Sequence, residues 1–246
     1  MRLQFVSDLH LETRPKQTFE QLIDTGKAKA LALLGDIAPL TNPNLRSFLE
    51  WCSERWETIF YIPGKTELLT DASIPVETAV QRLRDICESY QNIHVLYRDT
   101  FYTDDGLIVL GCPYWSLAPN ESPDLKKLHS EDFEWITQST RTYRNPCVIL
   151  THFGPLPWTQ TQFGLLDPTH TTQFPHIELI LKDPIVVWIF GHIHDTVETS
   201  KIWSNAGGDA KTILLLANGL GFLNKADPIP ERYRKDAIVR VDPTLF

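Results

Sequence analysis

Short apolar runs alternate with amphipathic stretches along the first third of the chain. The apolar runs are typical of buried strands and fall at residues 2–7, 30–34 and 58–62. Between and after them, apolar side chains recur at helical spacing, which predicts helices at residues 15–27, from 42 to 52 and from 75 to 90. Asn42-Pro43 is typical of an N-cap followed by the first helical residue. This alternation of strands and helices predicts a parallel sheet.

The pattern changes after residue 90, where short strands follow one another through polar turns. Strands are predicted at residues 93–96, 101–103, 107–111, 147–151, 185–190, 197–203, 212–217 and 237–241. We expect one helix near residues 131–140 and another that ends before Pro184. No repeat, low-complexity tract or Gly/Ser/Pro linker divides the chain, so we predict a single domain, residues 1–246, with two packed sheets.

Composition excludes several classes of protein. Hydrophobic residues make up 42% and charged residues 22% of the chain, which excludes a disordered or coiled-coil polypeptide. No apolar run approaches the roughly 20 residues of a membrane-spanning helix, and the N-terminus turns polar too early for a secretory signal. We therefore expect a cytoplasmic protein without a membrane partner. The widely spaced cysteines predict reduced core thiols at Cys52, Cys87, Cys112 and Cys147.

The net charge limits the classes of ligand that the chain is expected to bind. The formal net charge is -8, and no Lys/Arg cluster stands out. Long duplex nucleic acid needs a row of cations to release its counterions, so the sequence argues against that ligand. A small phosphorylated molecule fits if metals make one site locally positive, and a protein partner stays open.

Residues that bind divalent metals follow four of the predicted strands directly. They are Asp8 and His10, Asp36, His152, and His192 and His194. Side chains at the carboxyl ends of parallel strands converge where open α/β sheets bind ligands. Imidazole and carboxylate together suit Zn, Mn or Fe, while the lack of thiolates argues against a structural cysteine-type zinc site. Each segment alone occurs often by chance, but their shared position predicts one metal site.

Taken in chain order, these segments resemble the sequence blocks of the calcineurin-like metallophosphoesterases. The blocks are Asp8-x-His10, Gly35-Asp36, Pro63-Gly64-x-x-Glu67, Thr151-His152 and Gly191-His192-x-His194, and they span nearly the whole chain. The resemblance implies a four-layer α/β/β/α sandwich of two mixed β-sheets flanked by helices. It also implies a two-metal site that hydrolyses phosphoesters with a metal-bound hydroxide.

The resemblance implies a role for each ligand. Asp8, His10 and His194 would hold the first metal, Asp36 would bridge, and His152 and His192 would hold the second. A carboxylate can bridge two cations and a neutral imidazole cannot, which agrees with that role for Asp36. The cofactor is expected to be a divalent ion (Mn, Fe, Zn or Mg), with one ion expected and a second left open.

One block departs from the family pattern. The family reads Gly-Asn-His-Glu or Gly-Asn-His-Asp where this chain reads Gly64-Lys65-Thr66-Glu67. An ammonium has no lone pair, so Lys65 cannot replace a metal-ligating asparagine. Either Lys65 swings away and water fills the gap, or the second site is empty and the ammonium pairs with Asp36 and contacts phosphate. Thr66 replaces the histidine that assists the leaving group, a loss that typically costs ~10²–10⁴-fold in rate. No residue is therefore assigned a catalytic role.

Three functions remain open on these grounds. The first is a divergent phosphoesterase with reduced activity on a small phosphomonoester or phosphodiester. The alternative is a catalytically decayed scaffold, a binding or structural protein that retains the fold and a partial metal site. A nuclease is the third, restricted by the acidic balance to short or single-stranded substrates.

Several other residues allow two interpretations each. Some aromatic residues near predicted loops either wall a pocket or anchor the loops, namely Tyr114, Trp115, Trp158 and Phe163. Asp195 either orients a ligand imidazole or is a solvated turn residue, and the turn is favoured. Among the other histidines, His94 is expected to be structural. Three others either reach the site or are surface residues without a role: His129, His170 and His176.

Overall fold

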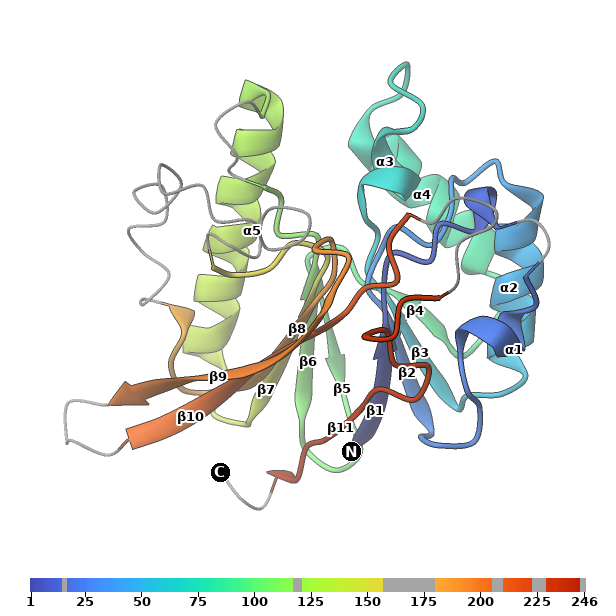
Figure 1. Cartoon of the computed structure of the whole chain (residues 1–246). Coiled ribbons are helices and arrows are strands. Elements are labelled where there is room, and N and C mark those ends of the chain that lie inside the picture. Colours follow the sequence, from blue (N-terminus) through green and yellow to red (C-terminus); the bar gives the residue numbers. More distant parts are fainter. Residues whose placement is uncertain (15–16, 117–120, 157–179, 205–209, 223–228, 244–246) are drawn as a thin grey trace.

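The computed structural model describes residues 1–14, 17–116, 121–156, 180–204, 210–222 and 229–243 (Figure 1). The first sheet has the strand order β11-β1-β2-β3-β4. Its strands are β1 (Arg2–Val6), β2 (Ala30–Leu33), β3 (Thr58–Tyr61), β4 (Ile93–Val95) and β11 (Ile238–Arg240). Strands β1 to β4 are parallel and β11 is antiparallel to β1, so this sheet is mixed.

The second sheet has the strand order β5-β6-β7-β8-β10-β9. Its strands are β5 (Asp99–Tyr102), β6 (Ile108–Cys112), β7 (Cys147–Thr151), β8 (Ile185–Phe190), β9 (Thr196–Ser204) and β10 (Ala210–Asn218). The four central strands are parallel, and the two edge strands β5 and β9 are antiparallel to their neighbours. The second sheet is therefore also mixed, as predicted.

The two sheets face each other, and helices cover their outer faces (Figure 1). The described helices are a 3-10 turn (Leu11–Thr13), α1 (Phe19–Leu22), α2 (Pro43–Ser53), α3 (Lys65–Leu69), α4 (Val76–Cys87) and α5 (Pro123–Thr142). Apolar side chains of α2 and α4 pack on the first sheet, and Ile136 of α5 packs on the second. The predicted four-layer α/β/β/α arrangement is confirmed. That residues 1–246 form a single domain stays a prediction.

Strand β2 shows why the apolar runs are continuous. Ala30, Ala32 and Leu34 point into the cluster between the two sheets, whereas Leu31 and Leu33 point into the cluster beneath the helices. Successive strand side chains alternate between faces, and both faces of this strand are covered, so every position is apolar. The run ends where the strand leaves the core, and there the polar residues begin.

The structure corrects several predicted boundaries. Within the described residues of the expected helix at 15–27, only Phe19–Leu22 is helical, because Ile23 takes an extended conformation and buries its side chain beneath the first sheet. The helix expected at 131–140 is longer, since Ser122 caps it and Pro123 opens it. The short helix α3 was not predicted. Most of the helix expected before Pro184 lies outside the described residues.

Two further expectations concern the core and the membrane. All four cysteines are free and buried, as predicted. None of the helices in the described part of the chain combines the length and apolar character that a bilayer-spanning segment needs.

Candidate metal centre

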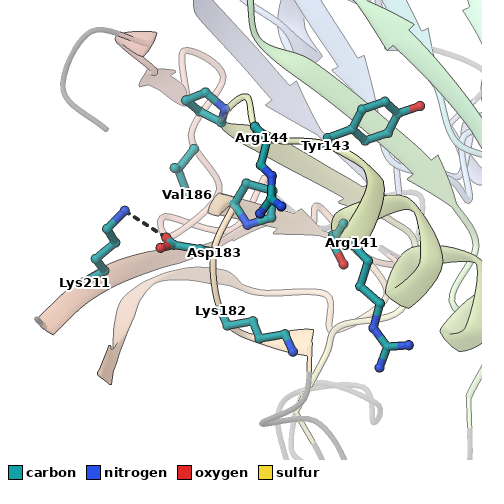
Figure 2. A pocket seen from close by; sticks show the side chains of 10 residues that line it. Arg141, Tyr143, Arg144, Lys182, Asp183, Val186 and Lys211 are labelled. Carbon is teal, nitrogen blue, oxygen red and sulfur yellow. Dashed lines mark ion pairs between the residues drawn. The ribbon is translucent and has the colours of Figure 1, made fainter. Parts of the chain in front are cut away.

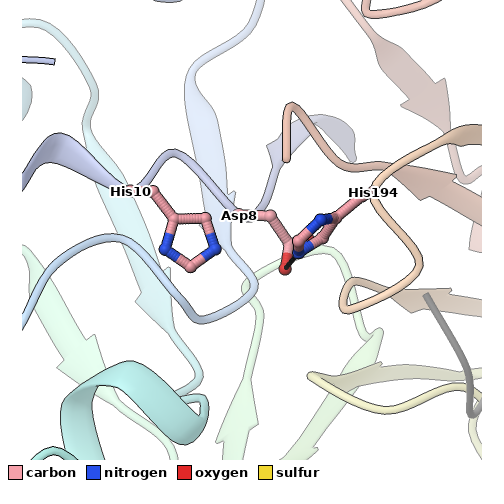
Figure 3. Close-up of side chains that lie close together, drawn as sticks. All are labelled: Asp8, His10 and His194. Carbon is pink, nitrogen blue, oxygen red and sulfur yellow. Dashed lines mark ion pairs between the residues drawn. The ribbon is translucent and has the colours of Figure 1, made fainter. Parts of the chain in front are cut away.

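The first group of predicted ligands gathers at the carboxyl ends of strands from both sheets. Asp8 and His10 follow β1, and His194 follows β8 (Figure 3). One ligand atom from each lies within 4.8 Å of the others, and all three residues are buried. The Nε2 atom of His194 lies 3.5 Å from Oδ1 of Asp8, while Oδ2 of Asp8 accepts a 2.9 Å hydrogen bond from the backbone N–H of His192. The fold therefore places these three donors as one set.

The second group adjoins the first through Asp36. Asp36 follows β2, His152 follows β7 and His192 follows β8, and their ligand atoms lie within 4.8 Å of one another. The Oδ2 atom of Asp36 lies 3.6 Å from Nε2 of His152 and 3.9 Å from Nε2 of His10. One carboxylate oxygen of Asp36 is thus near a histidine nitrogen from each group, so Asp36 lies between the two groups. The six side chains gather as expected, and their assignment as metal ligands is taken up below as a proposal.

The backbone at these positions is unusual. Five of the six residues have positive φ angles, namely Asp8 (56°), His10 (45°), Asp36 (54°), His192 (67°) and His194 (52°). Residues other than glycine rarely adopt this region, which costs on the order of 1–3 kcal/mol for each residue. The surrounding structure therefore holds the donor side chains in place at a conformational cost, as is common at functional sites.

Glycines beside the donors are required by space. A Cβ atom on Gly64 would lie 2.5 Å from Oδ1 of Asp36 and 2.8 Å from Cε1 of His152. Gly35 has a φ of +80°, and its Cβ would lie 2.6 Å from Nδ1 of His152. The Gly35-Asp36 and Pro63-Gly64 blocks thus reflect close approach of the backbone to the donor groups.

Hydrogen bonds fix which nitrogen of two imidazoles faces the centre. Nδ1 of His152 donates to the carbonyl oxygen of Leu34 at 2.8 Å, and Nδ1 of His10 lies 2.9 Å from Oε1 of Glu12. In the neutral form of each ring, Nε2 then carries the free electron pair that a metal requires. These two Nε2 atoms and Nδ1 of His192 are buried without a hydrogen-bond partner. A divalent cation would satisfy all three, so the donor set fits the implied metals.

Charge within the centre favours the ligand forms of Asp8 and His192 but not that of His10. Burial alone would raise the pKa of Asp8, but the hydrogen bond from His194 and the nearby histidines hold that pKa well below its usual range. Burial and neighbouring positive groups lower the pKa of His192 well below its usual value, which keeps its imidazole neutral. Burial opposes protonation of His10, but Glu12 and the two aspartates raise its pKa overall. A metal at His10 would therefore have to compete with a proton for the imidazole.

Glu67 stabilises the backbone around the centre by accepting several hydrogen bonds. Its carboxylate accepts hydrogen bonds from the backbone N–H groups of Gly64 (2.7 Å), Asp36 (3.0 Å) and Ile37 (2.7 Å), and from the Tyr61 hydroxyl (3.0 Å). It thereby ties the loop after β2 to the loop after β3. Burial and the Asp36 carboxylate raise the pKa of Glu67, while these donors oppose that rise. Glu67, the last residue of the Gly64-Lys65-Thr66-Glu67 block, therefore has a structural role.

Lys65 is directed away from Asp36. Its Nζ atom lies 2.8 Å from Oε1 of Glu121 and 5.5 Å from the centre of the Phe153 ring. Oδ1 of Asp36 instead accepts a 2.7 Å hydrogen bond from the backbone N–H of Thr66. Of the two alternatives for Lys65, the structure favours the one in which the ammonium turns away from the centre, because the ammonium pairs with Glu121 and not with Asp36.

The remaining candidates that lie in the described part of the chain do not join the centre. Tyr114 and Trp115 are fully buried, so they anchor the loop after β6 and do not wall an open pocket. His129 is buried in α5 beside the carbonyl oxygen of Trp115, and burial lowers its pKa to about 4. Asp195 lies 3.1 Å from an Arg232 nitrogen, in agreement with a turn residue. Four candidates lie outside the described residues: Trp158, Phe163, His170 and His176.

In the described part of the chain, three residues near the centre were not predicted from the sequence. Glu12 orients His10, Glu121 binds Lys65, and Phe222 stacks on the His10 ring. Glu12 stands two residues after His10, and that spacing could have indicated its role. Glu121 and Phe222 are distant in sequence from their partners, and no local pattern marks them.

A separate pocket of about 370 Å³ lies at the opposite ends of β7 and β8 (Figure 2). Arg141, Arg144, Lys182 and Lys211 line it, and Lys211 pairs with Asp183 at 3.0 Å. The pocket adjoins the amino ends of these strands, whereas the donor groups follow the carboxyl ends. It is therefore no part of the metal centre.

Comparison with known proteins finds one similar sequence and several similar folds. No family model matches the chain. Uncharacterized protein L509 of Acanthamoeba polyphaga mimivirus is 26% identical in an alignment of 289 positions that covers 99% of this chain and 98% of that protein. Among solved structures, TT1561 of Thermus thermophilus aligns with a TM-score of 0.52 and 15% identity over 89% of this chain and 88% of its own. GAP50, the anchor in the inner membrane complex of Plasmodium, aligns with a TM-score of 0.52 and 12% identity over 94% of this chain and 76% of its own.

The similarities to the solved structures extend to the arrangement of the two sheets, and a shared fold does not by itself determine an activity. The chain thus shares the two-sheet α/β fold of the calcineurin-like metallophosphoesterases, to which its sequence blocks also point.

Proposed function

We propose that the chain is a divergent metal-dependent phosphoesterase that hydrolyses a small phosphomonoester or phosphodiester at a reduced rate. The observation that carries this proposal is the position of Oδ2 of Asp36, within 4 Å of a histidine nitrogen from each donor group. Two divalent ions held in this way would lower the pKa of a water and offset the charge on phosphoryl oxygens. The six donors named above would hold those ions, which we expect to be Mn, Fe, Zn or Mg.

The protein's own groups explain both the retained chemistry and the reduced rate. His10 and His152 present oriented Nε2 atoms, and Asp36 offers a shared oxygen. Thr66 stands where the family has its leaving-group histidine, and a hydroxyl does not titrate near neutral pH. With Lys65 bound to Glu121, the second ion would keep three protein ligands and complete its shell with water.

A decayed scaffold is the second candidate, because Lys65 and Thr66 both change reactive positions while Gly64 and Glu67 preserve the local structure. The similarity to GAP50, named as an anchor, illustrates that the fold by itself does not require catalysis. The buried nitrogens without a partner favour metal binding over an empty scaffold, since leaving such groups unpaired costs about 1–3 kcal/mol each.

Activity with a defined metal tests the proposal. Protein stripped by a chelator and reloaded with Mn²⁺ should hydrolyse 4-nitrophenyl phosphate or its bis-ester above the rate of the stripped protein. Equal rates with and without the metal would reject the phosphoesterase and favour the scaffold. Shortening of a labelled single-stranded oligonucleotide in place of the small esters would instead support a nuclease.

Restoring the family block should improve the site. The double substitution Lys65→Asn with Thr66→His supplies an amide oxygen for the second ion and an imidazole for the leaving group. We expect bound metal at sub-saturating Mn²⁺ to rise toward two equivalents and the turnover number to rise at least about 10-fold, part of the ~10²–10⁴-fold that a positioned acid–base residue contributes. Metal analysis and steady-state rates measure both effects.

The single variants serve as controls for that experiment. Lys65→Asn alone should raise metal content, whereas Thr66→His alone should raise turnover only when metal is saturating. Unchanged metal content and turnover in the double variant would show that the defect lies elsewhere.

A further inference from the structure

Phe222 is a large apolar side chain that remains 56% exposed beside the first donor group. Its ring centre lies 3.9 Å from that of His10 with an interplanar angle of 26°, so the two rings are stacked. The His194 ring meets it at 5.0 Å and 72°, in an edge-on arrangement. One face of Phe222 therefore lies against a predicted metal ligand, while more than half of the side chain remains accessible.

The backbone before Phe222 is fixed to the same loop that carries Asp8. The N–H groups of Leu220 and Gly221 donate to the carbonyl oxygens of Ser7 (3.1 Å) and Asp8 (3.0 Å). The buried Arg14 guanidinium donates to the carbonyl oxygens of Leu9 and Gly221. These bonds connect the segment that carries Asp8 to the segment that precedes Phe222, and they fix the backbone next to the ring.

Gly221 adds a steric reason for this position. Its φ is +80°, and a Cβ atom there would lie 2.8 Å from Cβ of His194. The chain therefore passes against His194 as closely as a glycine allows, and the next residue is the exposed phenylalanine. This close approach of the backbone places the aromatic ring of Phe222 at the edge of the metal centre.

We propose that Phe222 determines substrate specificity by stacking on a planar aromatic ring in the organic part of the substrate. The inference rests on the proposed function, because the phosphoryl group would be held at the metals next to this ring. A second ring over the accessible part of Phe222 removes apolar surface of both partners from water, and aromatic pairs prefer stacked or edge-on contact. The substrate class is thus a phosphoester that carries an aryl group or a nucleobase.

Binding of non-hydrolysable ligands tests this assignment without requiring turnover. Benzylphosphonate and cyclohexylmethylphosphonate have the same charge and similar size but differ in ring planarity. Titration calorimetry of the Mn²⁺-loaded protein should show about 3- to 10-fold tighter binding of the benzyl ligand, the range expected for one aromatic pair. Phe222→Leu should bring the ratio close to one, and Phe222→Tyr should preserve it.

Two controls separate stacking from a structural role. Tyr102 is an exposed aromatic residue on β5, and Tyr102→Leu should keep the wild-type ratio. Metal content should be equal in wild type and both Phe222 variants, because the ring contacts His10 without donating to a metal. A pair with and without adenine, a nucleoside phosphonate and a ribose phosphonate, then distinguishes a nucleobase from a simple aryl group.

Clear results would overturn the assignment. An unchanged benzyl preference in Phe222→Leu, no preference in wild type, or no phosphonate binding would each reject it. Lower metal content in Phe222→Leu would show that the ring only covers His10. The predicted ratios without turnover of any ester would keep the role of Phe222 and reject hydrolysis, so the two proposals fail separately.

Discussion

Asp36→Asn should reduce phosphoesterase activity on the order of 10³-fold and prevent two ions from binding together. The asparagine oxygen can still accept the 2.7 Å hydrogen bond from the N–H of Thr66, so the local fold is retained. The atom that replaces Oδ2 becomes an amide nitrogen, which carries protons and cannot bridge cations. Steady-state rates at saturating Mn²⁺ and metal content after gel filtration measure the two effects.

The matched control is an aspartate on the surface of the second sheet. Asp99→Asn at the start of β5 should leave activity and metal content within about 2-fold of wild type, since surface substitutions usually have small effects. An Asp36→Asn protein with wild-type activity and two bound ions would show that Asp36 is not the shared ligand.

Glu67→Ala should destabilise the protein by about 3–5 kcal/mol, because several buried donors lose their shared acceptor and each unsatisfied group costs about 1–3 kcal/mol. The substitution leaves the N–H groups of Gly64, Asp36 and Ile37 and the Tyr61 hydroxyl without their acceptor in the interior. It also releases the loop after β2 from the loop after β3. Urea denaturation of the metal-free protein measures the change in unfolding free energy apart from any metal loss.

The control for this measurement is a glutamate that makes no such network. Glu88→Ala at the exposed end of α4 should change the unfolding free energy by less than about 0.5 kcal/mol. A loss below about 1 kcal/mol in Glu67→Ala would contradict the role of Glu67 as the acceptor that joins the two loops.

Much of the fold could be predicted because its core strands are buried on both faces. Ala30 to Leu34 form a continuous apolar run since both faces of β2 are covered, and the same run shows where the strand ends and Asp36 begins. The donor group could be predicted for the same reason, because parallel strands bring their carboxyl ends together.

Other features depend on contacts between distant residues and have no local pattern. The length of α1 is set by Ile23, which leaves the helix to bury its side chain beneath the first sheet. The direction of Lys65 is set by Glu121, 56 positions away in the sequence. The stacking of Phe222 on His10 requires the loop after β10 to meet the loop after β1, a meeting that only the folded chain shows.

The central claim is that two groups of buried side chains hold divalent ions around Asp36. An anomalous-scattering map from crystals grown with Mn²⁺ tests it most directly. We predict one peak among Asp8, His10 and His194 and a second among Asp36, His152 and His192, about 3.5–4 Å apart as in other two-metal sites. A map that lacks the peak at one or both of the groups would contradict the claim.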